Sequence, residues 1–365
     1  MHKTIKPVVF PLDESVHNNI IEWWYYNGYL KDAEGNDYSY MNCLFRVDVK
    51  KVKISFLSKI PLKISYFSNS SISDLCNKSF SNIIAPFSLI SKDSFLGPML
   101  FINYINPVMN LHYINCVIEK LDESVYHIKN KNIDLKLTSV KNPLMIGGKG
   151  YLDFTSKTTY YYSLTNLKTT GRIKIRNKWI DVSGKSWMDH QWADVCYSNA
   201  KWNWFSIQLD NETEIVFCMY DDNDTRTYFA DISNIEGSQE HHTEIIITPR
   251  GKCWKSPKSK ASYPLSWNLK IPAKKINLNV TAILDNQEML FGSINYWEGA
   301  IRINGMIKGK KVTGTGFMEL VGYFSNYNNI NYIFDEVEDK IIWFISLAKN
   351  GATNLTGNIK KIFST

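Results

Sequence analysis

The sequence predicts an all-β protein built as two similar β-barrel domains in tandem, and three features of the 365-residue chain support this prediction. Apolar and polar residues alternate over short runs in most of the chain, which is the period of a half-buried strand. No run carries the sustained 3.6-residue apolar stripe of an amphipathic helix. A strand-like segment of the first half recurs in the second half. We expect an N-terminal domain over residues 1–195 and a C-terminal domain over residues 196–365.

The first strands are expected within residues 20–49. Strand alternation places Glu22 and Trp24 on one face and Trp23 on the other. A second strand follows turn residues that include two glycines. Glu22 beside two indoles has two interpretations: it is the acid of a binding pocket, or it is a strand residue paired with an arginine such as Arg46.

Residues 50–110 give the weakest strand signal. Four prolines interrupt a segment dominated by Ser, Asn, Ile and Phe. We expect irregular structure there, either short helices or an insertion that covers a barrel mouth. Residues 117–180 return to alternating runs of strand length, separated by turn residues such as Gly147-Gly148 and Arg176-Asn177.

An internal repeat appears when residues 171–189 are laid over residues 301–319. The two segments share an Arg-Ile pair and then the pattern V-[ST]-G-x-[SG]-[WF]-M-[DE], which places Asp189 on Glu319. The constant offset favours duplication of a β unit over chance. Because the period is too long for a solenoid, we infer two similar β domains that meet near residues 193–201.

The two copies differ directly after the shared pattern. The first continues as His190-Gln191-Trp192 and the second as Leu320-Val321-Gly322. Ionisable and aromatic residues follow only the first copy, so we expect any chemistry to lie there, at the junction of the domains.

The C-terminal part repeats the alternating pattern. Strands are expected over residues 262–323, and residues 331–364 add closing strands that include Lys340–Ala348. Closed or nearly closed barrels would remove the exposed edges of so strand-rich a chain.

Composition and charge argue against several classes of protein. The net charge of +7 is small and the lysines are scattered, so we expect no nucleic-acid partner. The six cysteines form no C-x-x-C pair, and adjacent histidines such as His241 and His242 point apart in a strand, so we expect neither a metal site nor a disulfide scaffold. The start of the chain shows no apolar signal segment, and no apolar run reaches membrane-spanning length. These features predict a soluble, cytoplasmic protein.

Candidate site residues are densest in residues 183–222, which contain four tryptophans, one histidine and several carboxylates. Alternation places His190 and Trp192 on one face of a strand, and Tyr220 and Asp222 on one face of another. If those strands line one cavity, the four side chains converge on it.

A buried aspartate in such a cavity would have a definite chemistry. Enclosure by aromatic rings raises the pKa of a carboxyl group and lets it hold a proton near neutrality. Such an acid can protonate an alkene, and Trp or Tyr faces can stabilise the resulting cation by about 1–2 kcal/mol each. His190 could orient the acid or take a proton from water. The alternative is that His190 is a hydrogen-bonded core histidine and Asp222 a turn residue.

A series of motifs occurs in one order between about residues 8 and 325. The motifs are Glu22-Trp23-Trp24-Tyr25-Tyr26, Phe45-Arg46, Tyr161-Tyr162-Ser163-Leu164, Trp187-Met188-Asp189-His190-Gln191-Trp192, Trp202-x-Trp204-Phe205-Ser206, Tyr263-Pro264-x-x-Trp267, Tyr296-Trp297-Glu298-Gly299 and Gly316-Phe317-Met318-Glu319. Together they resemble the hydroxyneurosporene synthase/AttH-like family, which includes carotenoid 1,2-hydratases, kievitone hydratase and lipocalin-like cyclases such as the fungal Diels–Alderases.

This resemblance implies two tandem lipocalin-like β-barrels with a hydrophobic pocket between them, and catalysis without a metal or organic cofactor. In the hydratases of the family, a His-x-Trp pair and a Tyr-x-Asp pair are linked to acid-type addition of water. His190-x-Trp192 and Tyr220-x-Asp222 match those patterns, with Asp221 as an alternative to Asp222. Residues 50–110 have no counterpart that we can align.

We therefore expect a cofactor-independent enzyme that acts on carbon–carbon double bonds of a small hydrophobic polyene or isoprenoid, with acid-catalysed hydration as the first hypothesis. Asp222 would donate the proton, and Tyr220 and His190 would orient it. The expected substrate-binding residues are Trp192, Trp204, Trp24, Glu22, Trp187 and Asp189. Two alternatives remain: a cyclase or Diels–Alderase that folds a polyene in the pocket, and a non-catalytic carrier of lipophilic ligands.

Overall fold

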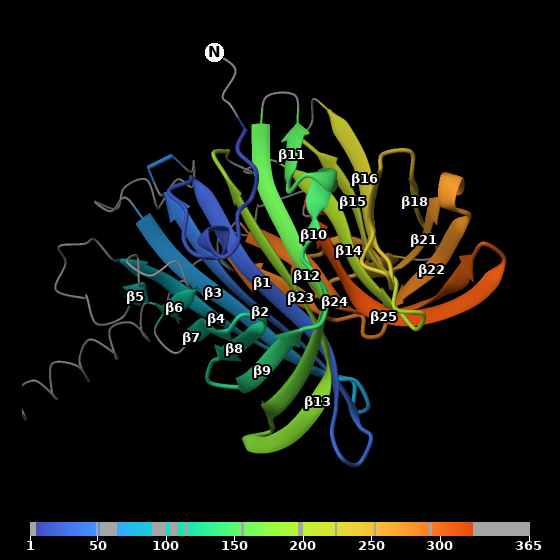
Figure 1. Cartoon of the computed structure of the whole chain (residues 1–365). Coiled ribbons are helices and arrows are strands. Elements are labelled where there is room, and N and C mark those ends of the chain that lie inside the picture. Colours follow the sequence, from blue (N-terminus) through green and yellow to red (C-terminus); the bar gives the residue numbers. More distant parts are fainter. Residues whose placement is uncertain are drawn as a thin grey trace, which may run out of the picture.

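The computed structural model describes residues 5–48, 50–51, 64–89, 100–102, 109–113, 116–154, 157–195, 200–222, 225–251, 253–291 and 294–323. Within these residues the regular structure is antiparallel β-sheet, with short 3₁₀ turns at η1 (Leu12–Glu14), η4 (Ile146–Gly148) and η5 (Pro272–Lys274). The two main sheets curl side by side (Figure 1), which confirms the predicted all-β, two-barrel architecture. The described part contains no helix long and apolar enough to cross a membrane.

The first sheet is 13-stranded and contains the N-terminal half of the chain. Its main path runs β4-β3-β2-β1-β13-β12-β9-β8-β7-β6-β5, and β10 and β11 pair with β12. The strands are β1 (Ile21–Lys31), β2 (Asp37–Asp48), β3 (Ile64–Asp74), β4 (Ser79–Leu89), β5 (Leu100–Ile102), β6 (Asn110–Tyr113), β7 (Cys116–Asp122), β8 (Val125–Lys129), β9 (Ile133–Ser139), β10 (Leu144–Met145), β11 (Tyr151–Phe154), β12 (Lys157–Ile175) and β13 (Lys178–Ala193).

The second sheet is 10-stranded and begins at Lys201. Its main path runs β17-β16-β15-β14-β25-β24-β22-β21-β18, with β23 paired to β24, and a separate hairpin joins β19 to β20. The strands are β14 (Lys201–Leu209), β15 (Glu214–Asp221), β16 (Arg226–Ser233), β17 (Gln239–His242), β18 (Ile246–Pro249), β19 (Cys253–Lys255), β20 (Ser262–Pro264), β21 (Ser266–Ile271), β22 (Ile276–Ala282), β23 (Glu288–Phe291), β24 (Ile294–Ile307) and β25 (Lys310–Val321). The predicted domain boundary at residues 195 and 196 falls in the connection between β13 and β14, and it stays a prediction.

The two sheets repeat one strand order. β13 lies between β1 and β12 in the first sheet, as β25 lies between β14 and β24 in the second. Asp189 and Glu319 occupy matching places on β13 and β25, as the sequence overlay predicts. The constant offset is wrong further upstream, because Val182 pairs with Gly171 but Val312 pairs with Gly305. The first hairpin is longer, so Arg172 and Arg302 are not equivalent.

Residues 50–110 are more regular than expected where the structure describes them. β3 and β4 extend the first sheet beyond β2, so the expectation of irregular structure or short helices is wrong for residues 64–89. Pro86 lies in β4, at the end of the strand order, where proline costs no ladder bond on the outer side. The closing strands expected over residues 331–364 lie outside the described residues.

Three apolar clusters hold the fold together. One lies inside each curled sheet, and the third joins residues of both sheets, including Tyr25, Trp187, Trp204 and Phe317. The central strands are therefore buried on both faces. In β1, for example, Trp24 faces the core of the first sheet and Tyr25 faces the domain junction. This double burial explains the continuous aromatic run from Trp23 to Tyr26 in β1.

Candidate active site

Two adjacent rows of large side chains cross the inner face of the first sheet. Residues paired across neighbouring strands bring them together, because direct partners on one face lie side by side. The pairings of β1 with β13 and of β13 with β12 give the rows Trp24–His190–Tyr162 and Glu22–Trp192–Tyr160. His190 and Trp192 thus share a face, as predicted, and four predicted site residues (Glu22, Trp24, His190 and Trp192) form one group.

The N-terminal segment before β1 closes over these rows. The carboxylate of Glu14, in η1, accepts hydrogen bonds from the Tyr126 hydroxyl at 2.6 Å and from Lys120 Nζ at 2.5 Å. Its backbone carbonyl accepts a hydrogen bond from Trp24 Nε1 at 3.1 Å. These bonds anchor the segment to the sheet and bring His17 next to Glu22.

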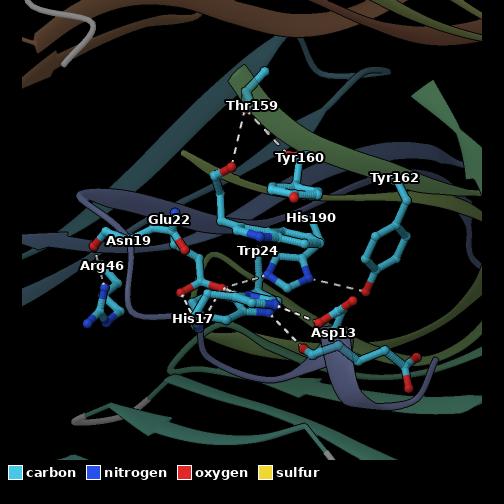
Figure 2. A network of polar contacts seen from close by, with 12 residues as sticks. Asp13, His17, Asn19, Glu22, Trp24, Arg46, Thr159, Tyr160, Tyr162 and His190 are labelled. Atoms are coloured by element: carbon cyan, nitrogen blue, oxygen red, sulfur yellow. Dashed lines mark hydrogen bonds and ion pairs between the residues drawn. The ribbon is translucent and has the colours of Figure 1, made fainter. Parts of the chain in front are cut away.

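Five residues then form one hydrogen-bonded chain, which we call the histidine network: Asp13, His17, Glu22, His190 and Tyr162 (Figure 2). His17 Nδ1 and His190 Nε2 both contact Glu22 Oε1, at 2.7 and 2.9 Å. His17 Nε2 lies 3.1 Å from Asp13 Oδ1, and the Tyr162 hydroxyl lies 3.2 Å from His190 Nδ1. The chain runs from partly exposed Asp13 and His17 to fully buried His190 and Tyr162.

The two histidines of this network have opposite pKa shifts. Burial alone would lower the pKa of His17, but hydrogen bonds to Asp13 and Glu22 and their negative charges raise it to about 9. Burial lowers the pKa of His190 to about 4, and its contact with Glu22 only partly offsets this effect. Burial would raise the pKa of Glu22, but the two histidines hold it below its ordinary value. At neutral pH, His17 is an imidazolium, Glu22 a carboxylate and His190 a neutral imidazole.

These charges determine the direction of each hydrogen bond. Neutral His190 has one N–H, which it donates from Nε2 to the Glu22 carboxylate. Its Nδ1 lone pair therefore accepts the hydrogen bond from the Tyr162 hydroxyl. The network presents a proton donor in His17 and a proton acceptor in His190, joined through one carboxylate.

Two indoles cover the network. Trp192 stacks on His17 with ring centroids 3.9 Å apart, and Trp24 stacks on His190 at 4.8 Å. A cation over the face of an indole is stabilised by about 0.5–2 kcal/mol, so Trp192 also favours the protonated form of His17.

The same three donors have the chemistry of a metal site. The ligand atoms of His17, Glu22 and His190 lie within 4.8 Å of one another. Their mutual hydrogen bonds already satisfy all three groups, and Asp13 supplies a further negative charge to His17. The hydrogen-bonded arrangement therefore accounts for the geometry by itself.

A cleft of about 1030 Å³ opens beside the network. Its lining includes Phe10, Glu14, Tyr126 and Leu164, and also residues 235–237, which connect β16 to β17 of the second sheet. Phe10 also packs edge-on against Tyr162, with centroids 4.8 Å apart. The cleft and the network are thus separated by one side chain.

Other predicted site residues lie on the opposite face of the first sheet, at the domain junction. Asp189 accepts hydrogen bonds from Ser163 at 2.5 Å, from the Trp187 indole at 2.7 Å and from Tyr161 at 2.8 Å. The Tyr161 hydroxyl in turn accepts a bond from Trp204 Nε1 of the second domain at 2.9 Å. Burial raises the pKa of Asp189 to about 7 despite these bonds.

Sequence reasoning missed two further carboxyl groups at this junction. Glu298 on β24 and Glu319 on β25 are direct cross-strand partners, and both interact with the charge of Asp189. Glu319 accepts a hydrogen bond from Trp202 Nε1 at 3.0 Å. The internal repeat was the available signal, because it aligns Glu319 with Asp189 in the sequence. We call Asp189, Glu298 and Glu319 the junction carboxyl cluster.

Two expectations about the site need correction. Glu22 binds His17 and His190, and Arg46 instead donates to the backbone carbonyl of Asn19 at 2.8 Å, so the suggested pairing of Glu22 with Arg46 is wrong. His190 and Trp192 do not converge with Tyr220 and Asp222. They lie in the core of the first sheet, whereas Tyr220 belongs to the junction cluster.

The reason for this separation is strand alternation. The face of β13 that carries His190 points into the first sheet, and only its opposite face meets the second domain. Asp222 follows the end of β15, where its carboxylate accepts a hydrogen bond from the backbone N–H of Thr225 at 2.9 Å. The other residues missed by sequence reasoning, Asp13 and His17, precede the first strand and carry no local pattern.

Two curated proteins are similar in sequence to part of this chain. Kievitone hydratase of Fusarium solani subsp. phaseoli is 24% identical over 217 residues, covering 55% of this chain and 59% of that protein. Dehydratase asqC of Emericella nidulans is 24% identical over 206 residues, covering 53% and 58%. The aligned region thus spans less than two thirds of these curated relatives.

Two solved structures share the fold. An AttH structure from Nitrosomonas europaea has a TM-score of 0.74 at 21% identity, covering 87% of this chain and 98% of that one. Kievitone hydratase from Nectria haematococca has a TM-score of 0.69 at 18% identity, covering 87% and 94%. The model of one family, described as AttH-like, matches residues 114–323, which is more than half of the chain. The resemblance seen in the motifs is confirmed, and the chain belongs to the AttH-like family.

Proposed function

We propose that this protein is a hydro-lyase, which adds water to a carbon–carbon double bond of a small hydrophobic molecule or forms such a bond by removing water, and that the histidine network is its acid–base machinery. The curated relatives support the reaction class, since one is named a hydratase and the other a dehydratase. The isoprenoid nature of the substrate comes from the motif resemblance alone.

One observation carries the assignment of the site: two histidines on one carboxylate oxygen have opposite protonation states at neutral pH. Elimination of water needs a base to take a proton from carbon and an acid to protonate the departing hydroxyl group. Pairs of groups whose surroundings drive their pKa values apart are the natural source of such an acid and base. His17 and His190 are such a pair.

In the dehydration direction, a C–H bond and a C–O bond break, a C=C bond forms and water leaves. The C–H proton passes through the Tyr162 hydroxyl to Nδ1 of His190, and the imidazolium of His17 protonates the departing hydroxyl. His190 then releases its extra proton and His17 regains one by exchange with solvent, and the Glu22 carboxylate, which contacts both rings, stabilises whichever ring is protonated. Hydration is the same sequence in reverse.

The expected roles of Asp222 and Tyr220 stay proposals of lower rank. Tyr220 packs with Trp204 in the apolar cluster between the sheets, and Asp222 follows β15 of the second sheet, so we place neither residue in this acid–base chain. Trp24 and Trp192 keep the role of wall, since both stack on network histidines.

The test is product analysis in heavy-oxygen water. The purified protein is incubated with kievitone, and with a panel of isoprenoid alkenes and their tertiary alcohols. We expect at least one compound to gain or lose one water, with heavy oxygen in the hydrated product. His190→Gln and Glu22→Gln should abolish turnover, whereas His127→Gln, which changes a surface histidine of β8, should not. Unchanged mass across the panel with retained tight binding would favour a carrier, and an isomer of unchanged mass would favour a cyclase.

A further inference from the structure

The Phe10 side chain lies between the cleft and the histidine network. Its ring lines the cleft and packs edge-on against Tyr162, with ring centroids 4.8 Å apart. The Tyr162 hydroxyl in turn contacts Nδ1 of His190 at 3.2 Å. Phe10 is 36% exposed, whereas Tyr162 is fully buried and does not belong to the described residues that line the cleft. A molecule in the cleft therefore meets Phe10 before it reaches Tyr162.

The turn that carries Phe10 is closed by Asp13. The backbone N–H of Val9 donates a hydrogen bond to Oδ2 of Asp13 at 2.7 Å, and the N–H of Asp13 donates to the carbonyl of Val9 at 2.9 Å. Val9 and Leu12 have exposed side chains, so they give the turn little apolar packing. Segments with few buried contacts open at a lower free energy than the rest of a fold. The turn can thus move while the sheet stays in place.

Both ends of this turn are fixed to the first sheet. Val8 packs against the apolar cluster inside that sheet, and the Glu14 carboxylate binds Tyr126 and Lys120. Residues 9–13 lie between these two anchors. Motion of the turn is therefore local, and it displaces the Phe10 ring relative to Tyr162.

The cleft next to Phe10 suits an apolar molecule. Leu121, Val140 and Ile235 are large apolar residues with exposed side chains, and all three line the cleft. They come from separate parts of the chain, and exposed apolar side chains that gather at one place mark a binding surface. The apolar body of a substrate fits this surface, and only the group at its double bond has to pass Phe10.

We propose that Phe10 is the gate of the histidine network and determines the size of the substrate group that reaches Tyr162. The inference rests on the proposed function, since the group that passes the gate is the one on which the network acts. Asp13 connects the gate to the acid, because its Oδ2 holds the turn while its Oδ1 lies 3.1 Å from Nε2 of His17 (Figure 2). Phe10 precedes residues 114–323, which the family model matches, so the assignment comes from the structure alone.

The experiment compares two tertiary alcohols of different size, tert-amyl alcohol and cumyl alcohol, which both carry the group that hydration of a branched alkene forms. Binding to the full chain is followed by NMR through the ring signals of His190, so the measurement needs no turnover. In Phe10→Ala the affinity for cumyl alcohol should rise about tenfold or more relative to that for tert-amyl alcohol, because the ring no longer limits the path. Phe10→Trp should shift this ratio in the opposite direction.

Leu12→Ala is the matched control, since Leu12 is exposed in the same turn but lies outside the part of the described chain that lines the cleft. It should leave the ratio of affinities unchanged, and thermal unfolding would verify that all three variants fold. An unchanged ratio in both Phe10 variants, an equal change in Leu12→Ala, or His190 signals that respond to neither alcohol would each overturn the proposal. If the alcohols bind as expected while no compound is turned over, the gate stands and the proposed function fails.

Discussion

The imidazole of His17 lies flat on the indole of Trp192, with 2° between the ring planes. The two residues come from different parts of the chain: His17 from the N-terminal segment and Trp192 from β13. Their contact fixes the partly exposed end of the histidine network against the sheet. It also links the His-x-Trp motif of the sequence to a proton donor that lies outside that motif.

Replacing Trp192 should therefore change the ionisation of His17. In Trp192→Leu the cation loses an aromatic face worth about 0.5–2 kcal/mol, so the pKa of His17 should fall from about 9 by about one unit. NMR titration of the His17 ring measures this shift. Trp179→Leu is the matched control, because Trp179 is exposed and stacks on Arg172 rather than on a network residue. A pKa that is the same in both variants would contradict the assignment.

Asp13 should set the alkaline limit of activity. His17 can act as the acid only while it is an imidazolium. Its contacts with Asp13 and Glu22 raise its pKa to about 9 and so keep it protonated at neutral pH. Asp13→Asn keeps a similar side-chain shape but removes one negative charge, so the pKa of His17 should fall by about one unit or more. The alkaline limb of kcat/KM should move to lower pH by the same amount, while the acid limb stays in place. An unmoved alkaline limb would exclude His17 as the acid.

Tyr162 should act in proton transfer without contributing much to stability. In Tyr162→Phe, His190 loses the hydroxyl that contacts its Nδ1 at 3.2 Å, while the buried ring remains in its core position. We expect kcat to fall about 10²–10⁴-fold, the usual range for loss of a general acid or base, with little change in KM. Tyr40→Phe is the control, since its buried hydroxyl binds Ser186 away from the network. Equal loss of activity in both variants would indicate a general packing effect.

The sequence predicted those relationships that follow from strand periodicity. Alternation alone placed His190 beside Trp192 and put Asp189 on the opposite face, and both placements are confirmed. The duplicated pattern also matched Asp189 with Glu319, which the two sheets bear out. These are local properties of a strand, and a strand keeps them in any tertiary setting.

The sequence could not show which strands face one another. Whether the face of β13 that carries His190 meets Tyr220 depends on how the sheet curls, and no local pattern encodes this. His17 reaches Glu22, and Asp13 reaches His17, in a segment that Glu14 anchors through Tyr126 and Lys120, which are remote in sequence. Glu22 and Arg46 are direct partners across β1 and β2, but their side chains bind other groups, and Arg46 donates to the carbonyl of Asn19.

The junction carboxyl cluster should make the protein less stable as the pH rises. Glu319 has a pKa of about 7 in the folded state, above its ordinary value of 4.5, and the pKa of Glu298 is raised as well. The folded state therefore holds protons that the unfolded chain has released, and the resulting stability is fully present below a pH of about 4.5 and is lost as the pH rises through about 7.

Glutamine keeps the uncharged form at every pH. Glu319→Gln should thus remove much of the fall in the free energy of unfolding between these two pH values, as measured by urea denaturation. Glu240→Gln, whose exposed carboxylate has a lowered pKa from its bond with Lys274, should not remove that fall. An unchanged pH dependence in Glu319→Gln would show that the cluster is ionised in the folded protein.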